Sequence, residues 1–268
     1  MFAEVSSEIT PCTCRPERAA RPAVNGVEID PIPSVDLVPR IDGFLLCGGS
    51  HIVHFCPADP TVLARSDPSY RAILNAGDLN LPDGMSVVWA LRLLGQKAER
   101  ITGADAFATL CDAGRERGLR HYLYGGSPSV AEQLPRSLEA AFPGVLIGGA
   151  ESPPFGPVGD GELADAAGRI QAAGADLLWV GLGTPKQDLV AERLRRDRAA
   201  PVILCVGAAF DFLSGAKKRA PVWMQRAGLE WAHRLVNEPK RLWSRYLIGN
   251  PRFLMSVAMD ALRRERRM

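Results

Sequence analysis

The protein has 268 residues, of which 47% are hydrophobic and 23% are charged. This composition is close to that of an average globular protein, so it excludes wholesale disorder and a fibrous repeat. The longest uncharged apolar runs have only the length of a strand, and the N-terminus lacks a secretory pattern, so the sequence predicts neither a membrane-spanning helix nor a signal peptide.

The predicted elements begin after an N-terminal arm. Residues 1–40 are rich in proline and show little periodicity, so we expect an extended or disordered arm with a short strand near 24–29. From 41 to 216, apolar runs alternate with amphipathic stretches, which predicts strands at 52–56, 121–124, 145–147, 176–181 and 202–206, and helices at 60–75, 85–94, 104–117, 129–141, 161–173 and 185–198. This alternation predicts a doubly wound α/β fold, a parallel sheet with helices on both faces.

The last fifth of the chain differs in charge and pattern. From Lys217 onward we expect helices alone, at 221–236, 240–247 and 252–266, and we count thirteen basic residues against four acidic ones. Tryptophan, tyrosine, leucine and phenylalanine lie among the basic residues, as in helices at a membrane interface. The sequence therefore predicts a basic helical appendage over 217–268 that meets an anionic membrane, with lipid favoured over nucleic acid; a solvated basic surface is the alternative.

Three glycine-rich loops each follow a predicted strand, where ligands of open α/β sheets bind. They are Gly125–Pro128, Gly181–Gln187 and Gly207–Asp211. Glycine at a strand end usually only makes a turn, but three such loops favour a nucleotide-type ligand. Lys186 opposes the dipole of the helix that it opens, a conflict that a bound diphosphate relieves. No loop has the complete dinucleotide fingerprint, which counts against a nicotinamide-dependent oxidoreductase.

Asp83 is the candidate catalytic residue, because Asp83-Gly84 directly precedes an apolar helix. Aspartate is also a good N-cap, and glycine eases the turn, so a purely structural role is the alternative. A carboxylate held in a loop can instead act as a general base. Six cysteines scattered without disulfide-like spacing favour a reducing, cytoplasmic compartment.

Taken together, the motifs resemble the WecG/TagA/CpsF family of glycosyltransferases, glycosyltransferase family 26. The resemblance covers about residues 59–253 and leaves the N-terminal arm outside. It rests on NAGDLNLPDGMSVVWALRLLG (75–95), ERITGAD (99–105), YLYGGSPSV (122–130), GLGTPKQD (181–188), VGAAFDFLSGAKKRAPVWMQRAGLEWAHRL (206–235) and EPKRLWSRYLIGNP (238–251).

The resemblance implies a Rossmann-like fold with a C-terminal helical appendage. It implies an inverting enzyme that moves a sugar from a UDP-sugar to a saccharide on a polyprenyl diphosphate, for cell-envelope polysaccharide or exopolysaccharide. It implies a peripheral protein on the cytoplasmic face of the plasma membrane, a possible homo-oligomer, and Asp83 as general base. No metal cofactor is expected, since the sequence has no Asp-x-Asp motif. The residues expected at the UDP-sugar are Gly125, Gly126, Lys186, Gln187, Gly207, Asp211 and Arg100, and those expected at the acceptor diphosphate are Arg234, Arg241 and Arg245.

The chain also departs from its relatives. The Thr-x-Asn string that lines the pocket in many of them falls near Phe55 and Pro57, which leaves the donor open between an N-acetylmannosamine-type and a glucose-type sugar. His51 or His54 could substitute, although a structural role is favoured for both. Asp188 replaces the usual glutamate after Pro-Lys-Gln, and we expect it to keep that role. The competing hypothesis is a non-catalytic module that binds a nucleotide sugar and docks on a membrane.

Overall fold

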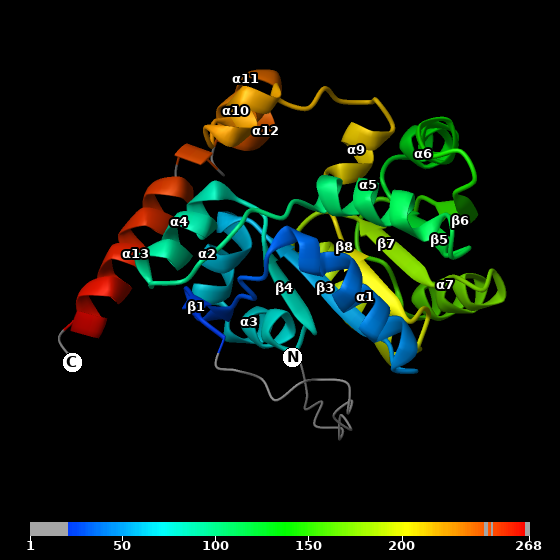
Figure 1. The fold of residues 1–268 in the computed structure, drawn as a ribbon, viewed down its shortest axis with the longest axis horizontal. Coiled ribbons are helices and arrows are strands. Elements are labelled where there is room, and N and C mark those ends of the chain that lie inside the picture. Colours follow the sequence, from blue (N-terminus) through cyan, green and yellow to red (C-terminus); the bar gives the residue numbers. More distant parts are fainter. Residues whose placement is uncertain (1–20, 244–245, 248, 266–268) are drawn as a thin grey trace.

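The computed structural model describes residues 21–243, 246–247 and 249–265 (Figure 1). A central sheet of six strands has the order β4-β3-β8-β7-β5-β6, and every neighbouring pair is parallel. Its strands are β3 (His51–Cys56), β4 (Leu79–Pro82), β5 (Arg120–Gly125), β6 (Leu146–Glu151), β7 (Leu177–Gly181) and β8 (Val202–Cys205). The expected α/β fold with a parallel sheet is confirmed.

Helices cover both faces of the sheet (Figure 1). On one face, α1, α5, α6 and α9 pack on the apolar side chains of the strands, and α7 and α8 do so on the other. A third apolar cluster lies under α2, α3 and α4. These helices are α1 (Leu37–Leu46), α2 (Ala58–Ser66), α3 (Pro68–Asn75), α4 (Met85–Leu93), α5 (Gly103–Gly114), α6 (Pro128–Ala141), α7 (Asp160–Ala172), α8 (Lys186–Arg196) and α9 (Ala209–Leu213).

Residues 21–40 are folded, which corrects the prediction of an extended arm over this part; residues 1–20 lie outside the described range. Strands β1 (Ala23–Val24) and β2 (Val27–Glu28) form a hairpin, and a 3-10 turn (Ser34–Asp36) leads into α1. Val24, Val27 and Ile29 are buried. Because Asp30 donates its N–H to the Asn80 carbonyl at 2.7 Å, this segment covers the β4 edge of the sheet, which would otherwise expose unpaired backbone groups.

Two local features differ from the prediction. Strand β4 was not expected, because it is short and contains Asn80, whose buried amide donates to the carbonyls of Glu28 (2.8 Å) and Leu74 (2.9 Å). The helix expected at 60–75 is two helices. Proline disfavours a helical residue before it, and Asp67 instead caps α3 by accepting from the N–H groups of Ser69 and Tyr70, both at 3.0 Å.

The C-terminal region is helical as expected, and it consists of α10 (Val222–Arg226), α11 (Glu230–Asn237), α12 (Pro239–Trp243) and α13 (Gly249–Glu265). Gly228 separates α10 from α11 and has a φ of +72°, in the left-handed region that favours glycine. Helix α13 packs along α2 (Figure 1), where Arg65 binds Asp260 through two nitrogens at 2.7 and 3.1 Å. We call residues 21–216 the sheet domain and 217–265 the appendage. No helix among the described residues is long and apolar enough to cross a bilayer.

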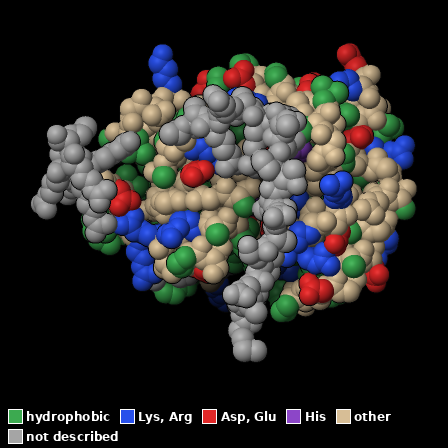
Figure 2. All heavy atoms as spheres, turned by 90° about the horizontal axis from the view of Figure 1, so that it is seen from below, with side chains coloured by type: hydrophobic (Ala, Val, Ile, Leu, Met, Phe, Trp, Pro, Cys, Tyr) green, Lys and Arg blue, Asp and Glu red, His purple; other side chains and the backbone are tan. Residues whose placement is uncertain are grey.

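The cysteines and the surface charge add two observations. Cys56, Cys111 and Cys205 are free and buried, whereas Cys47 is disulfide-bonded. On the face turned away from α10–α12, basic and acidic side chains are interspersed and hydrophobic ones are scattered wherever the described atoms are visible (Figure 2). Large exposed apolar side chains instead recur along the appendage, at Val222, Trp223, Val236, Trp243, Leu247, Leu254 and Met255.

Candidate active site

Two pockets meet at Asp83, beyond the carboxyl ends of β3, β4, β7 and β8. Pro57, Asp83, Glu230 and Arg234 line both of them. This edge of a parallel sheet is where α/β proteins bind ligands, because the strand ends there open into loops. The two pockets differ in lining, so we call them the polar pocket and the apolar pocket.

The polar pocket has a cavity volume of about 110 Å³ and lies mostly in the sheet domain. Its walls are loop residues with exposed backbone groups and a few polar side chains, including Thr102, Gly183, Thr184, Gln187, Gly207 and Arg219. The oxygen of the buried Gln187 side chain has no hydrogen-bond partner among the described residues, while its nitrogen donates to the Cys205 carbonyl at 3.3 Å. The pocket therefore offers directional polar groups to a ligand.

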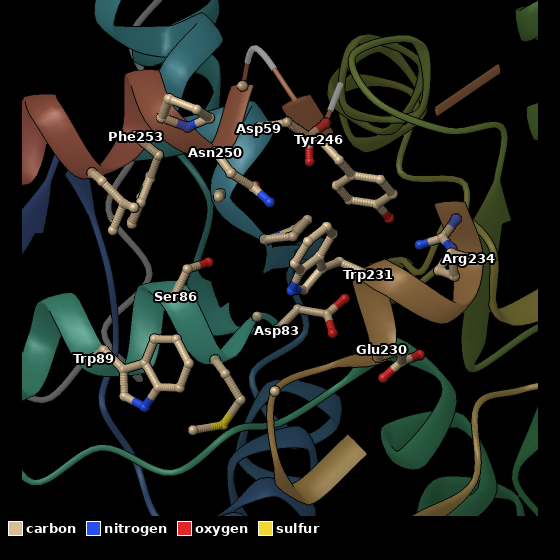
Figure 3. A pocket seen from close by; sticks show the side chains of 18 of the residues that line it. Asp59, Asp83, Ser86, Trp89, Glu230, Trp231, Arg234, Tyr246, Asn250 and Phe253 are labelled. Carbon is tan, nitrogen blue, oxygen red and sulfur yellow. The ribbon is translucent and has the colours of Figure 1, made fainter. Parts of the chain in front are cut away.

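The apolar pocket is larger, with a cavity volume of about 450 Å³, and it lies between α4 and the appendage. Trp89 from α4 and Phe253 from α13 lie on one side, whereas Asp83, Glu230 and Arg234 lie toward the other (Figure 3). Its remaining apolar lining includes Met85, Trp231, Tyr246, Leu247 and Leu254. One pocket thus combines a charged end with an extended apolar wall, a form suited to an amphipathic ligand.

Asp83 is held in place by the backbone around it. Its N–H donates to the Cys56 carbonyl at 3.3 Å, and Ile101 donates to the Pro82 carbonyl at 3.0 Å, so the ends of β3 and β4 fix the loop. The N-cap of α4 is Gly84, and no side chain caps the helix. The capping role considered for Asp83 is therefore wrong, and its carboxylate makes no hydrogen bond or ion pair with any other described residue.

The surroundings of Asp83 favour its protonated form. Burial is the main cause and the negative charge of Glu230 the second, and together they raise the pKa of Asp83 to about 6 against the opposing effect of Arg100, Arg234 and Arg219. A carboxylate with this pKa is ionised near neutral pH and is a stronger base than an ordinary aspartate. Shifted carboxylates of this kind concentrate at functional sites.

Cationic groups surround the shared wall. The Arg234 guanidinium lies 5.8 Å from the centre of the Phe212 ring, and its buried Nε has no hydrogen-bond partner in the part of the chain that the structure describes. Arg100 donates to the Glu230 carboxylate at 3.0 Å. Arg219 binds Thr102 and Asp105 and lies 3.9 Å from Glu230. Arg234 is thus available to an anionic ligand, whereas the other two already have carboxylate partners.

The structure places some of the expected nucleotide residues in these pockets and others outside them. Gln187 and Gly207 line the polar pocket, and Arg100 lines the apolar one. The residues that line neither pocket are Gly125, Gly126, Lys186 and Asp211; Asp211 forms an ion pair with Lys217 at 2.7 Å, and the Gly126 N–H donates to the Gly181 carbonyl. Their nucleotide roles remain predictions.

Of the expected diphosphate residues, Arg234 lies between the pockets. Arg245 is outside the described residues, and for Arg241 only the backbone in α12 is described. Phe55 and Pro57, at the positions of the missing Thr-x-Asn string, do line the polar pocket. This wall therefore has less hydrogen-bonding capacity than a Thr-x-Asn sequence would give.

His51 and His54 line neither pocket and are buried, which agrees with the structural role favoured for them. Asp188 accepts from Tyr70 Oη at 2.7 Å and lies 2.9 Å from His54 Nδ1, so it ties α3, α8 and β3 together. His54, Asp188 and Cys205 are a cluster of metal-ligating types among the described residues. Because Asp188 is already bonded through both oxygens and burial raises the pKa of the Cys205 thiol, we assign the cluster to the core.

Sequence reasoning missed Glu230 and Arg219. Both lie in the appendage segment that was interpreted through its positive charge and its aromatic residues. The available signal was that Glu230 is the only acidic residue between Lys217 and Asn237. An isolated acid among basic residues indicates a specific partner, and Arg100 is that partner here.

These features define a doubly wound α/β protein whose ligand site has a polar half in the sheet domain and an apolar half completed by a helical appendage. The chain belongs to the WecG/TagA/CpsF family of glycosyl transferases, whose sequence model matches residues 22–267. The match begins well before residue 41, so the expectation that the first forty residues lie outside the family is wrong for 22–40.

Two bacterial relatives are each 33% identical to this chain over 198 residues. One is from Bacillus spizizenii, with 72% of this chain and 73% of the relative covered, and the other is from Bacillus subtilis, with 74% and 75% covered. Both are named N-acetylglucosaminyldiphosphoundecaprenol N-acetyl-beta-D-mannosaminyltransferase. Those names describe a glycosyl transfer to a sugar carried on a polyprenyl diphosphate.

Proposed function

We propose that this protein is an inverting glycosyltransferase that moves a sugar from a UDP-sugar to a saccharide on a polyprenyl diphosphate, in cell-envelope or exopolysaccharide biosynthesis. The observation that carries the proposal is Asp83, an unpaired carboxylate in the wall shared by a polar and an apolar pocket. Family membership and the names of the two relatives support the same reaction class.

The two pockets suit the two substrates. The polar pocket, with Gln187 and the loops at Gly183 and Gly207, would take the UDP-sugar. The apolar pocket would take the lipid-linked acceptor, whose sugar and diphosphate would lie at the charged end and whose isoprenyl carbons would contact the aromatic wall. The donor is of the N-acetylmannosamine or the glucose type.

In the reaction, an acceptor hydroxyl attacks the anomeric carbon from the side opposite UDP. The new C–O bond forms as the bond to the diphosphate oxygen breaks, and the hydroxyl proton passes to Asp83. Negative charge grows on the departing UDP, and Arg234 together with backbone N–H groups of the polar pocket would stabilise it. Arginine suits diphosphate because its guanidinium donates in a bidentate manner. In this proposal no metal ion takes part.

We also propose that the appendage meets an anionic membrane from the cytoplasmic side. Its helices α10 and α11 bury none of their residues, and Trp223 and Trp243 are exposed. A lipid-borne acceptor has to be drawn from the bilayer, and the apolar pocket is lined by residues of this same region.

The test is transfer by the full-length protein. The assay contains N-acetylglucosaminyl-diphospho-lipid as acceptor, one UDP-sugar at a time from a panel of donors, and EDTA. One of the donors should release UDP and give a glycosylated lipid that mass spectrometry detects. Asp83→Asn should lower kcat by at least about 100-fold, because it removes the general base, while UDP binding measured by calorimetry is kept.

Asp112→Asn is the control, since this exposed residue on α5 forms an ion pair with Arg115, lies outside both pockets and should leave the rate unchanged. UDP binding without product from any donor would support the non-catalytic module instead. An undiminished rate in Asp83→Asn would remove Asp83 from the mechanism.

A further inference from the structure

Glu230 is the one acidic side chain besides Asp83 that lines both pockets, and it comes from the appendage rather than from the sheet domain. It is the first residue of α11 and lies at the shared wall near Asp83 (Figure 3). Two carboxylates so close together repel each other unless cations separate them. The geometry around Glu230 shows where those cations are.

Glu230 holds two arginines. Arg100 donates to one carboxylate oxygen at 3.0 Å, and Arg219 Nε lies 3.9 Å from the other. Arg100 also donates to the Gln225 side chain at 3.4 Å, and Arg219 is anchored by Asp105 and Thr102. Both arginines act electrostatically on Asp83, yet neither forms an ion pair with it. The network therefore directs the two guanidinium groups toward Glu230.

We propose that Glu230 is a positioning residue for Asp83: its carboxylate holds Arg100 and Arg219 in ion pairs, which keeps these cations off Asp83 and leaves Asp83 free to accept the acceptor's proton. The inference rests on the proposed function for the role of Asp83. It adds that the appendage supplies a charge on which the chemistry in the sheet domain depends.

The direction of the electrostatic effect follows from the groups around Asp83. The charged and titratable residues near it are Cys56 at the end of β3, Asp59 on α2, Arg100 after α4, Arg219 after α9, and Glu230 and Arg234 on α11. Glu230 raises the pKa of Asp83, and the three arginines lower it. Removing the Glu230 charge, with the arginines kept, must therefore lower the pKa of Asp83 and make it a weaker base.

The experiment is a titration of the Asp83 carboxyl by ¹³C NMR in the full-length protein without substrate, with Asp83→Asn used to assign the signal. Wild type should titrate near pH 6, and Glu230→Gln about one pH unit lower. Glu230→Asp, which keeps the charge, should stay close to wild type. The acidic limb of kcat/KM against pH should shift in the same direction, and kcat on the plateau should fall.

Glu192→Gln is the matched control. Glu192 has a comparably shielded carboxylate that also pairs with two arginines, Arg195 at 2.5 Å and Arg196 at 3.6 Å, but it lies on α8 outside both pockets. Its loss should leave the Asp83 titration where it is. A role of Glu230 limited to holding the appendage would lower activity at every pH without moving the titration.

An unchanged Asp83 titration in Glu230→Gln overturns the inference, and so does an equal shift in Glu192→Gln. If Glu230→Gln does not fold, Arg100→Gln probes the same network from the opposite side and should move the titration to higher pH; no rise there also overturns it. If no donor supports transfer, the proposed function fails, while the titration still decides whether Glu230 controls Asp83.

Discussion

The sheet domain and the appendage are held in place by different interactions. In the sheet domain, every residue of β8 is buried, and the strands lie between two apolar clusters. In the appendage, α10 and α11 bury none of their residues, and α13 reaches the core mainly through Phe253. Leu242 is also buried, and ion pairs from Arg65 to Asp260, from Arg100 to Glu230 and from Arg219 to Asp105 join the appendage to the sheet domain.

This difference matters because the site is built from both regions. The loops of the sheet domain supply Asp83 and the polar pocket, and the appendage supplies much of the apolar pocket together with Glu230 and Arg234. Partly exposed ion pairs contribute little free energy, typically up to about 1 kcal/mol each. The sheet domain therefore supplies most of the free energy of unfolding. The appendage completes the site and contributes little to that free energy.

The largest effect on the free energy of unfolding should come from a substitution in the core of the sheet domain. Trp179 is fully buried, stacks on Phe107 with ring centres 3.8 Å apart, and donates to His121 at 2.9 Å. Trp179→Ala should lower the free energy of unfolding by about 3–5 kcal/mol in urea denaturation, since it leaves a cavity and removes a buried hydrogen bond to His121. A loss below about 1 kcal/mol would contradict the assignment of stability to the sheet domain.

Substitution of Asp83, where the two regions meet, should have a smaller effect on the free energy of unfolding, and it should raise that free energy rather than lower it. Its pKa in the folded protein, about 6, lies above its ordinary value of 3.8, so the folded state binds more protons between these values and loses stability as the pH rises through them. Asp83→Asn removes this penalty, and above pH 6 it should stabilise the protein by about 1–2 kcal/mol after allowance for solvent screening.

The measurement is Tm against pH for both proteins. The variant should melt a few degrees higher at pH 7.5, and the difference should shrink as the pH falls and vanish below about pH 3, where Asp83 is protonated in the folded and unfolded states alike. A variant that is less stable than wild type at pH 7.5 would show that Asp83 helps to hold the fold rather than straining it.

The smallest effect on folding should come from the exposed face of the appendage. Trp223 is 64% exposed, so Trp223→Ser should change the free energy of unfolding by less than about 0.5 kcal/mol. If this face meets the membrane, the same substitution should reduce co-flotation with anionic vesicles. Phe155→Ser is the matched control, because Phe155 is fully exposed but lies in the sheet domain; it should leave flotation unchanged. Equal loss in both variants would remove the appendage from the membrane contact.

Much of the fold could be predicted because local sequence patterns determine the helices and strands. Apart from β4 and the break between α2 and α3, the strands and helices from 51 to 205 follow from alternating apolar periodicity, and the parallel sheet follows from their order. The predictions were wrong where contacts with a distant segment determine the local structure. Strand β4 exists because β3 and the 21–30 segment pair with it, and the burial of Val24, Val27 and Ile29 depends on that same edge.

The site shows the same division. The sequence by itself determined which residue types are present: Asp83 before a helix, glycine loops after strands, and a basic, aromatic C-terminal segment. Only the tertiary structure decided that Asp83 is not a helix cap, that Gln187 and Gly207 line the polar pocket while Lys186 does not, and that Glu230 pairs with Arg100. The reason is that charge pairing and burial depend on distances between segments more than a hundred residues apart, and no local pattern encodes these distances.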